Sequence, residues 1–160
     1  MATYDLLDST TLTSSASSVT FSSLDTVAAG YRDLILVVSG TNATGDQTLR
    51  IQINGDTGSN YYSVRMNGSG STATSNALSA QDNVQLGVFG TTQAVCITQI
   101  MDYSATDKHK TLLSRGDIAA SSTRATAGRW ANTSAITSIY VYGSNSYNFA
   151  ATFSLYGIAS

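Results

Sequence analysis

The sequence predicts an all-β fold, a single-domain antiparallel β-sandwich, and three observations support this. Ser and Thr supply 46 of the 160 residues (24 Ser and 22 Thr), whereas Glu is absent and Lys occurs only twice. Strong helix formers with charged side chains are therefore scarce, which disfavours a helical bundle or coiled coil. Short runs of alternating polar and apolar residues recur along the chain, and clusters of Gly, Asn, Asp and Ser separate them. This pattern is typical of half-buried strands joined by turns.

The first half of the chain holds four such runs. Residues 18–22 (SVTFS) alternate, whereas 33–39 (DLILVVS) are apolar on both faces and suit a central strand. Alternation returns in 49–53 (LRIQI) and in 62–66 (YSVRM). Segment 54–60 (NGDTGSN) lies between these two runs, and its Gly and Asn residues tolerate positive φ. We therefore expect it to form a hairpin loop.

The second half continues in the same way. Residues 67–72 (NGSGST) form the next loop, and 76–80 could form a short helix. Further apolar runs occur at 84–88, 95–101, 112–113, 136–141 and 149–158, where the last includes Phe149. A turn is expected at 143–145 (GSN). The total is roughly nine or ten strands, a number typical of a sandwich.

The number of strands favours a jelly roll over an immunoglobulin-like sandwich. A jelly roll wraps about eight antiparallel strands into two sheets. True immunoglobulin domains carry a Cys…Trp…Cys spacing, and this chain has one Cys. No composition shift or internal repeat divides the chain, so residues 1–160 are expected to form one domain. Segment 9–15 (STTLTSS) is polar and short of core anchors, so residues 1–16 are expected to form an N-terminal arm or an edge strand.

The residues that carry catalysis or bind metals are few. The one imidazole, His109, lies in the charged run 107–110 (DKHK), which is typical of a solvated turn, and Cys96 has apolar neighbours typical of a buried thiol. Asp residues lie mostly in turn-like contexts, where they bond to the local backbone. Zinc motifs are missing, and a calcium site in 54–60 would have the single carboxylate of Asp56. We therefore expect no enzyme activity, no metal and no cofactor.

Aromatic and Arg side chains are the strongest candidates for binding. Tyr140 and Tyr142 share one strand face, opposite Ile139 and Val141. Arg and Trp are the residue types that dominate protein interfaces, and 124–130 (RATAGRW) brings two Arg close to the one Trp. The candidate interface or ligand contacts are Tyr61, Tyr62, Arg124, Arg129, Trp130 and Tyr142.

Charge and hydropathy narrow the range of partners. The net charge is −2 and basic residues form no long cluster, so a nucleic-acid partner is not expected. No window of 18 consecutive apolar residues occurs, so we expect no membrane span. The N-terminus lacks a basic segment followed by an apolar one, so no secretory signal is expected and the chain would be made in the cytoplasm.

Several segments carry a pattern found in a known family. They are 4–14 (YDLLDSTTLTS), 18–23 (SVTFSS), 31–34 (YRDL), 53–61 (INGDTGSNY), 108–111 (KHKT), 127–130 (AGRW), 136–139 (ITSI), 148–151 (NFAA) and 153–158 (FSLYGI). Together they run through nearly the whole chain, and in them the sequence resembles structural proteins of tailed bacteriophages, cyanophages among them.

The resemblance implies a virion protein without a catalytic step. Tail-fibre members of this family often append such a module to a longer shaft, whereas we expect this module to stand alone. We therefore expect a capsid decoration (cement) protein that binds the major capsid protein at the capsid exterior as a homotrimer. The alternative is a lectin-like receptor-binding module at the tail fibre or tail tip, with a host-surface glycan as its ligand. A tail-tube or baseplate component is a further structural alternative.

Overall fold

The computed structural model describes residues 4–118, 121–148 and 151–159. These residues form twelve strands and one short helix. In chain order they are β1 (Tyr4–Thr11), β2 (Ala16–Phe21), α1 (Leu24–Val27), β3 (Tyr31–Gly40), β4 (Gln47–Ile53), β5 (Tyr61–Gly68), β6 (Ala73–Gln81), β7 (Val84–Phe89), β8 (Ala94–Met101), β9 (Lys110–Ile118), β10 (Ser122–Trp130), β11 (Ile139–Tyr147) and β12 (Thr152–Ala159).

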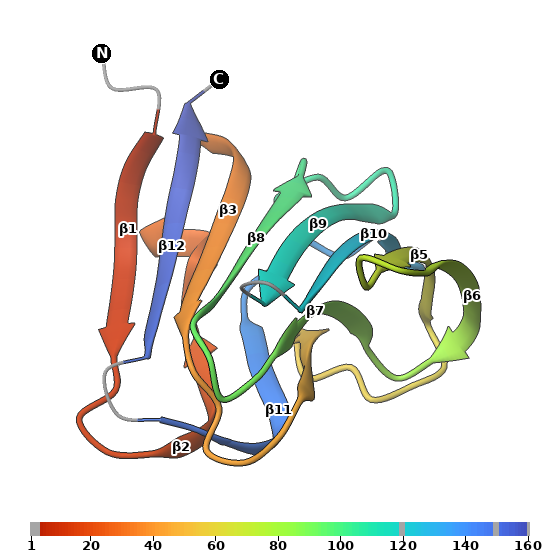
Figure 1. Ribbon diagram of the computed structural model, residues 1–160. Coiled ribbons are helices and arrows are strands. Elements are labelled where there is room, and N and C mark those ends of the chain that lie inside the picture. The colour runs from red at the N-terminus through yellow and green to blue at the C-terminus, as the bar shows by residue number, and fades with distance from the viewer. Residues whose placement is uncertain (1–3, 119–120, 149–150, 160) are drawn as a thin grey trace.

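Two antiparallel sheets pack together as a β-sandwich, which confirms the predicted fold class. The large sheet has eight strands in the order β1-β12-β3-β8-β9-β10-β5-β6, and the small sheet has four in the order β2-β11-β4-β7. Figure 1 shows the large sheet running from β1 on the left to β6 on the right. Strand β7 also contacts β8, β9, β10 and β5, so the large sheet curls over this edge of the small one.

The chain passes repeatedly from one sheet to the other. Strands β1, β3, β8 and β12 belong to the large sheet, and β2, β4, β7 and β11 belong to the small one. Two hairpins, β5–β6 and β9–β10, are added to the large sheet alone. The connection from β8 to β9 also stays in the large sheet, and the remaining connections between successive strands change sheet.

The loop between β4 and β5 corrects one prediction. Asn54 and Gly55 do adopt positive φ (54° and 65°), and the amide of Asp56 donates to the carbonyl of Ile53 at 2.9 Å. The predicted tight turn is therefore present. The two flanking strands do not pair, however, because β4 lies in the small sheet and β5 in the large one. The loop is a crossover between sheets rather than a hairpin.

The inner faces of both sheets form one hydrophobic core. Leu36, Val38, Ile51 and Phe153 are among its fully buried members. Where the large sheet curls over β7, Gly128 leaves space for Val84, and a Cβ on this glycine would lie 2.7 Å from Val84 Cγ1. The absence of a side chain at Gly128 therefore allows the two sheets to approach closely here.

Several local predictions are also corrected. The segment 76–80 belongs to strand β6, and the short helix lies at Leu24–Val27. The expected turn at 143–145 lies within β11, where the pairing with β2 shifts register between Tyr142 and Tyr147. Of the two alternatives for residues 1–16, an arm or an edge strand, Tyr4–Thr11 forms an edge strand paired with β12, which needs no correction. Phe149 lies outside the described residues.

Candidate binding surface

The outer face of the large sheet carries the most unusual surface of the molecule. On β5, the inward side chains are Tyr61 and Ser63, whereas Val64 and Met66 point to solvent with exposures of 50% and 62%. Strand β8 behaves similarly, since Cys96 is buried and Val95 is exposed. On β5 the apolar side chains therefore face outward, the reverse of a half-buried strand, whereas β8 carries apolar side chains on both faces.

Exposed apolar side chains gather on this outer face. Of the eight large apolar side chains exposed among the described residues, seven lie on it, and the eighth, Val27, lies on α1. The seven are Tyr4, Leu6, Val64, Met66, Val95, Met101 and Leu113. A random scatter of exposed apolar residues is normal, whereas a contiguous patch marks an interaction surface.

The strand register places three of these residues, Leu6, Val64 and Leu113, in one row across the sheet, which we call the apolar ladder. It crosses all eight strands through directly paired positions. Its members are Leu6, Tyr156, Ile35, Gln99, Leu113, Ala127, Val64 and Ala77. Gln99 is the one polar residue among them.

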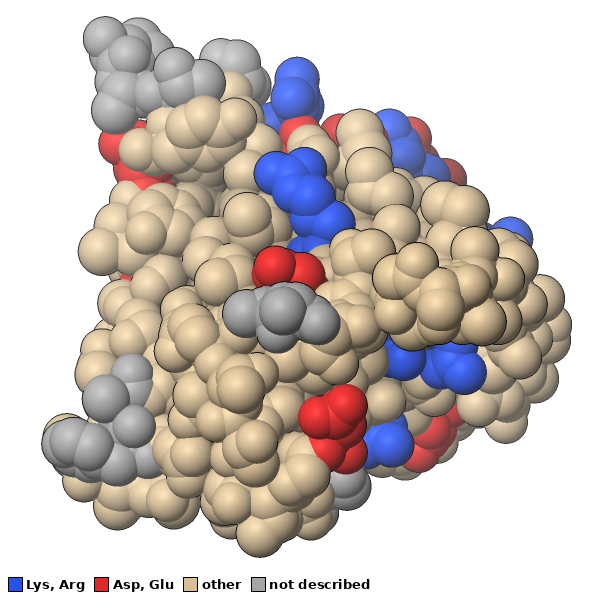
Figure 2. Space-filling view, in the orientation of Figure 1, with Lys and Arg blue, Asp and Glu red and all other residues tan. Residues whose placement is uncertain are grey.

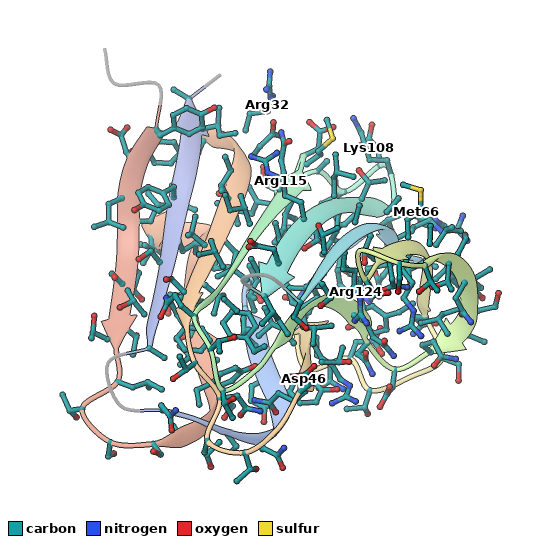
Figure 3. The ribbon with its side chains drawn as sticks, viewed as in Figure 1. Arg32, Asp46, Met66, Lys108, Arg115 and Arg124 are labelled. Carbon is teal, nitrogen blue, oxygen red and sulfur yellow. The ribbon has the colours of Figure 1, made fainter. Side chains whose placement is uncertain are left out.

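The middle of the outer face is hollowed. A depression of about 360 Å³ lies among side chains from β1, β3, β8, β9 and β12. The residues that line it include Tyr4, Ile35, Ile97, Leu113 and Ile158, with Arg115 at its border. Figure 3 shows Arg115 over the middle of the large sheet and Met66 at the end of the sheet near β5 and β6.

Charged groups on this face are few, and most of its visible surface is uncharged (Figure 2). Arg115 and Asp117 point outward from β9, two residues apart. Neither forms an ion pair within the described part of the chain. Arg129 lies over the ring of Tyr62, with its guanidinium carbon 4.8 Å from the ring centre. This cation–π contact orients both side chains at the surface.

Tyr62 and Arg129 are therefore the two sequence-predicted contacts that the structure brings together on the outer face. Their strands pair directly, with Arg129 opposite Tyr62 in the β10–β5 register. Thr111 and Met101 continue the same row on β9 and β8. This row lies beside the apolar ladder, two residues along each strand.

Tyr61 and Trp130, in contrast, are core residues, and their side chains offer no surface to a partner. Their exposures are 0% and 1%. The Tyr61 hydroxyl donates to the carbonyl of Asp56 (3.0 Å) and accepts from the amide of Ile53 (2.9 Å). Trp130 Nε1 donates to Asp56 Oδ2 at 2.7 Å. Sequence composition suggested interface anchors here, but both rings close the end of the sandwich.

Arg124 points to the inner side of β10. Its Nε donates to Asn67 Oδ1 (2.6 Å) and its Nη1 to the Gly87 carbonyl (3.4 Å). Burial, together with the nearby Arg65, lowers the pKa of Arg124. The side chain borders a polar hollow of about 350 Å³, with Asp46 also at its edge (Figure 3). Arg124 is therefore half-buried between β5, β7 and β10 and separate from the outer face.

Tyr142 belongs to a second surface, on the outer face of the small sheet. Tyr140 and Tyr142 share that face as predicted, while Ile139 and Val141 are buried on the other side. The two Tyr rings stack, with centroids 5.0 Å apart and planes 21° apart. Arg50 lies 6.0 Å from the Tyr142 ring centre. Burial and the nearby Asp82 raise the pKa of Tyr142.

The residues considered for chemistry occupy structural positions. His109 is exposed in the loop between β8 and β9, as the sequence predicts. Cys96 is buried, 3.3 Å from Ser114 Oγ, and burial raises the pKa of its thiol. Both carboxylate oxygens of Asp56 already accept hydrogen bonds from Asn60, and Gly58 and Trp130 donate as well. Within the described ranges, no three His, Cys, Asp or Glu side chains cluster as metal ligands would.

Sequence reasoning missed the apolar ladder, although one signal of it was present. Leu112 and Leu113 are adjacent, so β9 must expose one of them, and the structure buries Leu112 and exposes 57% of Leu113. Successive residues of a strand point to opposite faces, so two adjacent apolar residues place one apolar side chain on each face.

Comparisons with known proteins found no relative of this chain. No family model, no curated protein and no solved structure matches this chain. None of the helical structure in the described residues is long and apolar enough to cross a membrane. The fold and surface together define an all-β sandwich with an uncovered apolar sheet face.

Proposed function

We propose that this protein is a non-enzymatic structural component of a tailed-phage virion, a capsid decoration (cement) protein. In this proposal it binds the major capsid protein at the capsid exterior as a homotrimer. The observation that carries the proposal is the uncovered apolar outer face of the large sheet. Seven exposed large apolar side chains lie there, from Tyr4 to Leu113, and such a surface suits a protein that works in an assembly with other chains.

The physical basis of such a role is binding that exists only in the assembled shell. A protein that contacts neighbouring capsid subunits at once stabilises the assembled state by mass action. The chain is weakly charged, with 11% charged residues and 46 Ser and Thr residues, and this composition suits polar contacts around an apolar centre. The assignment to phages in particular rests on the resemblance of segments such as 4–14 and 127–130.

We further propose that the sandwich is a jelly roll enlarged by two hairpins. Eight strands are divided between the two sheets in the orders β1-β12-β3-β8 and β2-β11-β4-β7. All their pairings are antiparallel. A jelly roll likewise wraps eight antiparallel strands into two sheets, and it occurs in viral capsid and lectin domains. Fold alone does not assign function, so this analogy supports either binding role.

Localisation on intact particles is the test of the decoration role. Antibodies against the purified protein would be used for immunogold electron microscopy of phage particles isolated from infected host cells. We expect gold over the heads in many copies per particle. Label confined to the tail tip would reject decoration and support receptor binding. Particles without any label would reject both.

A receptor-binding role has one specific observation in its favour. The stacked Tyr140–Tyr142 pair with Arg50 forms a half-exposed aromatic surface on the small sheet. Tyr rings combine an apolar face with a polar hydroxyl, a combination suited to sugars. A glycan array compares the wild type with Tyr142→Ala, and with Tyr62→Ala as a matched control on the other sheet. Specific hits that Tyr142→Ala alone loses would support this role, and an array without hits would reject it.

A further inference from the structure

We infer that the outer face of the large sheet is the surface through which copies of this chain associate, so that a second copy covers the apolar ladder. The inference deepens the proposed function, and it rests on it only for the expectation that the protein self-associates. The inference identifies the surface through which the copies bind one another, whereas the proposed function identifies the capsid exterior as the location of the oligomer.

The size of the face fits a stable protein interface. The apolar ladder crosses the seven gaps between eight strands, so at about 4.8 Å per gap it measures about 34 Å. The outward rows from Tyr62 to Gly68 extend about 20 Å along the strands. The resulting area of about 700 Å² is close to the roughly 800 Å² that each partner of a standard interface buries.

The composition of the face favours a permanent partner. Interfaces between identical chains are more apolar than transient ones, because the subunits need not exist apart. Leu6, Val64 and Leu113 are each at least 50% exposed in the isolated chain. A chain whose apolar ladder stayed exposed to solvent would be prone to aggregate. Further copies of the chain are made in the same place, so a second copy is available to cover the apolar ladder as soon as the first has folded.

The shape of the face is self-complementary. One region is hollow, where Ile35, Ile97 and Leu113 line the depression of about 360 Å³. Another region, at β5, presents Val64 and Met66, which are 50% and 62% exposed. The projecting side chains of one copy therefore have a recess on the other copy to enter. Burial of such side chains in a packed pocket is the main source of interface energy.

The charges of the face complement one another as well. Arg115 and Asp117 lie two residues apart on the same side of β9, and neither has an ion-pair partner among the described residues. Where copies associate through this face, Arg115 of one copy can pair with Asp117 of the next. A face with one charge of each sign therefore matches itself, whereas a partner of single charge would leave one group unpaired.

The first test measures the mass of the purified protein by light scattering between about 1 and 100 µM. We expect an oligomer for the wild type and a monomer for Leu113→Asp, with at least about 100-fold weaker association. Thr20→Asp, an exposed position on the small sheet, is the matched control and should remain oligomeric. Circular dichroism verifies that both variants fold. A monomeric wild type, or an oligomer that persists in Leu113→Asp, would overturn the inference.

The second test asks whether the partner is a copy of the same chain. Arg115→Asp should weaken association by about 10-fold, because it places like charges opposite one another. The double swap Arg115→Asp with Asp117→Arg should restore it, since both copies change together. If the partner were a different protein, its charges would not change with the swap and association would stay weak. Association that the double swap fails to restore would therefore overturn the proposed contact between copies. Immunogold labelling does not depend on these results, so the proposed function can fail independently.

Discussion

Trp130 Nε1 donates a 2.7 Å hydrogen bond to Asp56 Oδ2, which joins the end of β10 to the crossover loop between β4 and β5. The same carboxylate accepts from the Asn60 side chain (2.9 Å) and from the amide of Gly58 (2.8 Å). The loop therefore folds around the carboxylate of Asp56. Hydrogen bonds to an ionised group contribute more to stability than neutral ones.

Replacement of this carboxylate should destabilise the protein. Asp56→Asn presents an amide group to Asn60 in place of an acceptor oxygen, and we expect a loss of about 1.5–3 kcal/mol in the free energy of unfolding at pH 7. Denaturant titration measures it. Asp8→Asn, at an exposed position of β1, is the control and should change stability by less than about 0.5 kcal/mol.

The same variant should alter the response to acid. Burial opposes ionisation of Asp56, but the donors Trp130, Asn60 and Gly58 outweigh it and hold the pKa of the carboxyl below its ordinary value. A carboxyl with a lower pKa in the folded state stabilises the protein above the unfolded pKa of about 3.9, and this contribution is lost as the pH falls through the folded-state pKa. The wild type should therefore lose more stability than Asp56→Asn between pH 5 and pH 2. Parallel acid curves for the two proteins would show that the carboxylate contributes nothing.

The close approach of the two sheets at Gly128 gives a second prediction. A methyl group there would lie 2.7 Å from Val84 Cγ1, far inside normal contact distance. We expect Gly128→Ala to cost about 1–3 kcal/mol, because an overpacked core must shift its side chains or backbone. Thermal and denaturant unfolding measure this loss.

Removal of the opposing side chain provides the control. In the double variant Gly128→Ala with Val84→Ala, the added methyl group occupies space that the Val side chain leaves. The two changes should therefore cost at least about 0.5 kcal/mol less together than the sum of their separate costs. Strict additivity would mean that the two positions do not touch.

Much of the fold could be predicted from local pattern, because a strand with one buried face carries an apolar residue at every second position. The runs around Val38 and Ile51 are strands with buried apolar residues, as expected. The segment 76–80 was different, since its Ala and Leu residues favour a helix locally. Pairing with β5 overrides that preference, and Ala77 lies opposite Val64 in the large sheet.

The candidate surface could be predicted only in part. Alternation shows that Val64 and Met66 share a face, but it does not say whether that face points inward. The direction depends on which strands lie across the sandwich, which is information from distant parts of the chain. Trp130 illustrates the same limit, since its hydrogen-bond partner Asp56 lies 74 residues away. Residue type suggested a surface anchor, and long-range packing placed the ring in the core.

A third prediction concerns Lys110, whose side chain is fully buried. Its Nζ donates to the carbonyl oxygens of Ala105 (2.5 Å), Lys108 (3.0 Å) and Thr133 (3.1 Å). This ammonium group therefore joins the loop before β9 to the segment after β10. Lys110→Met keeps the side-chain length but leaves three carbonyl oxygens without their donor. We expect a loss of about 2–4 kcal/mol in the free energy of unfolding.

Lys108→Met is the matched control for this change. Lys108 forms an exposed ion pair with Asp102 at 3.3 Å, and exposed pairs contribute at most about 1 kcal/mol. The two variants remove the same charge two residues apart, so a comparison of their unfolding curves isolates the effect of burial. Equal stabilities of the two variants would contradict a structural role for the Lys110 ammonium group.

The last prediction concerns Cys96, the single thiol of the chain. Its side chain is 1% exposed, and its Sγ lies 3.3 Å from Ser114 Oγ on the neighbouring strand. Burial raises the pKa of this thiol, so the reactive thiolate is disfavoured. The native protein should therefore react with a thiol reagent such as dithionitrobenzoate only when it opens, at a rate that increases with denaturant. In full denaturant one thiol per chain should react at once, which serves as the internal control. Since β8 and β9 lie at the middle of the large sheet, the slow native rate would report the opening of the sandwich itself. Rapid reaction in the native state, at the rate of the unfolded chain, would show that this part of the sheet is open.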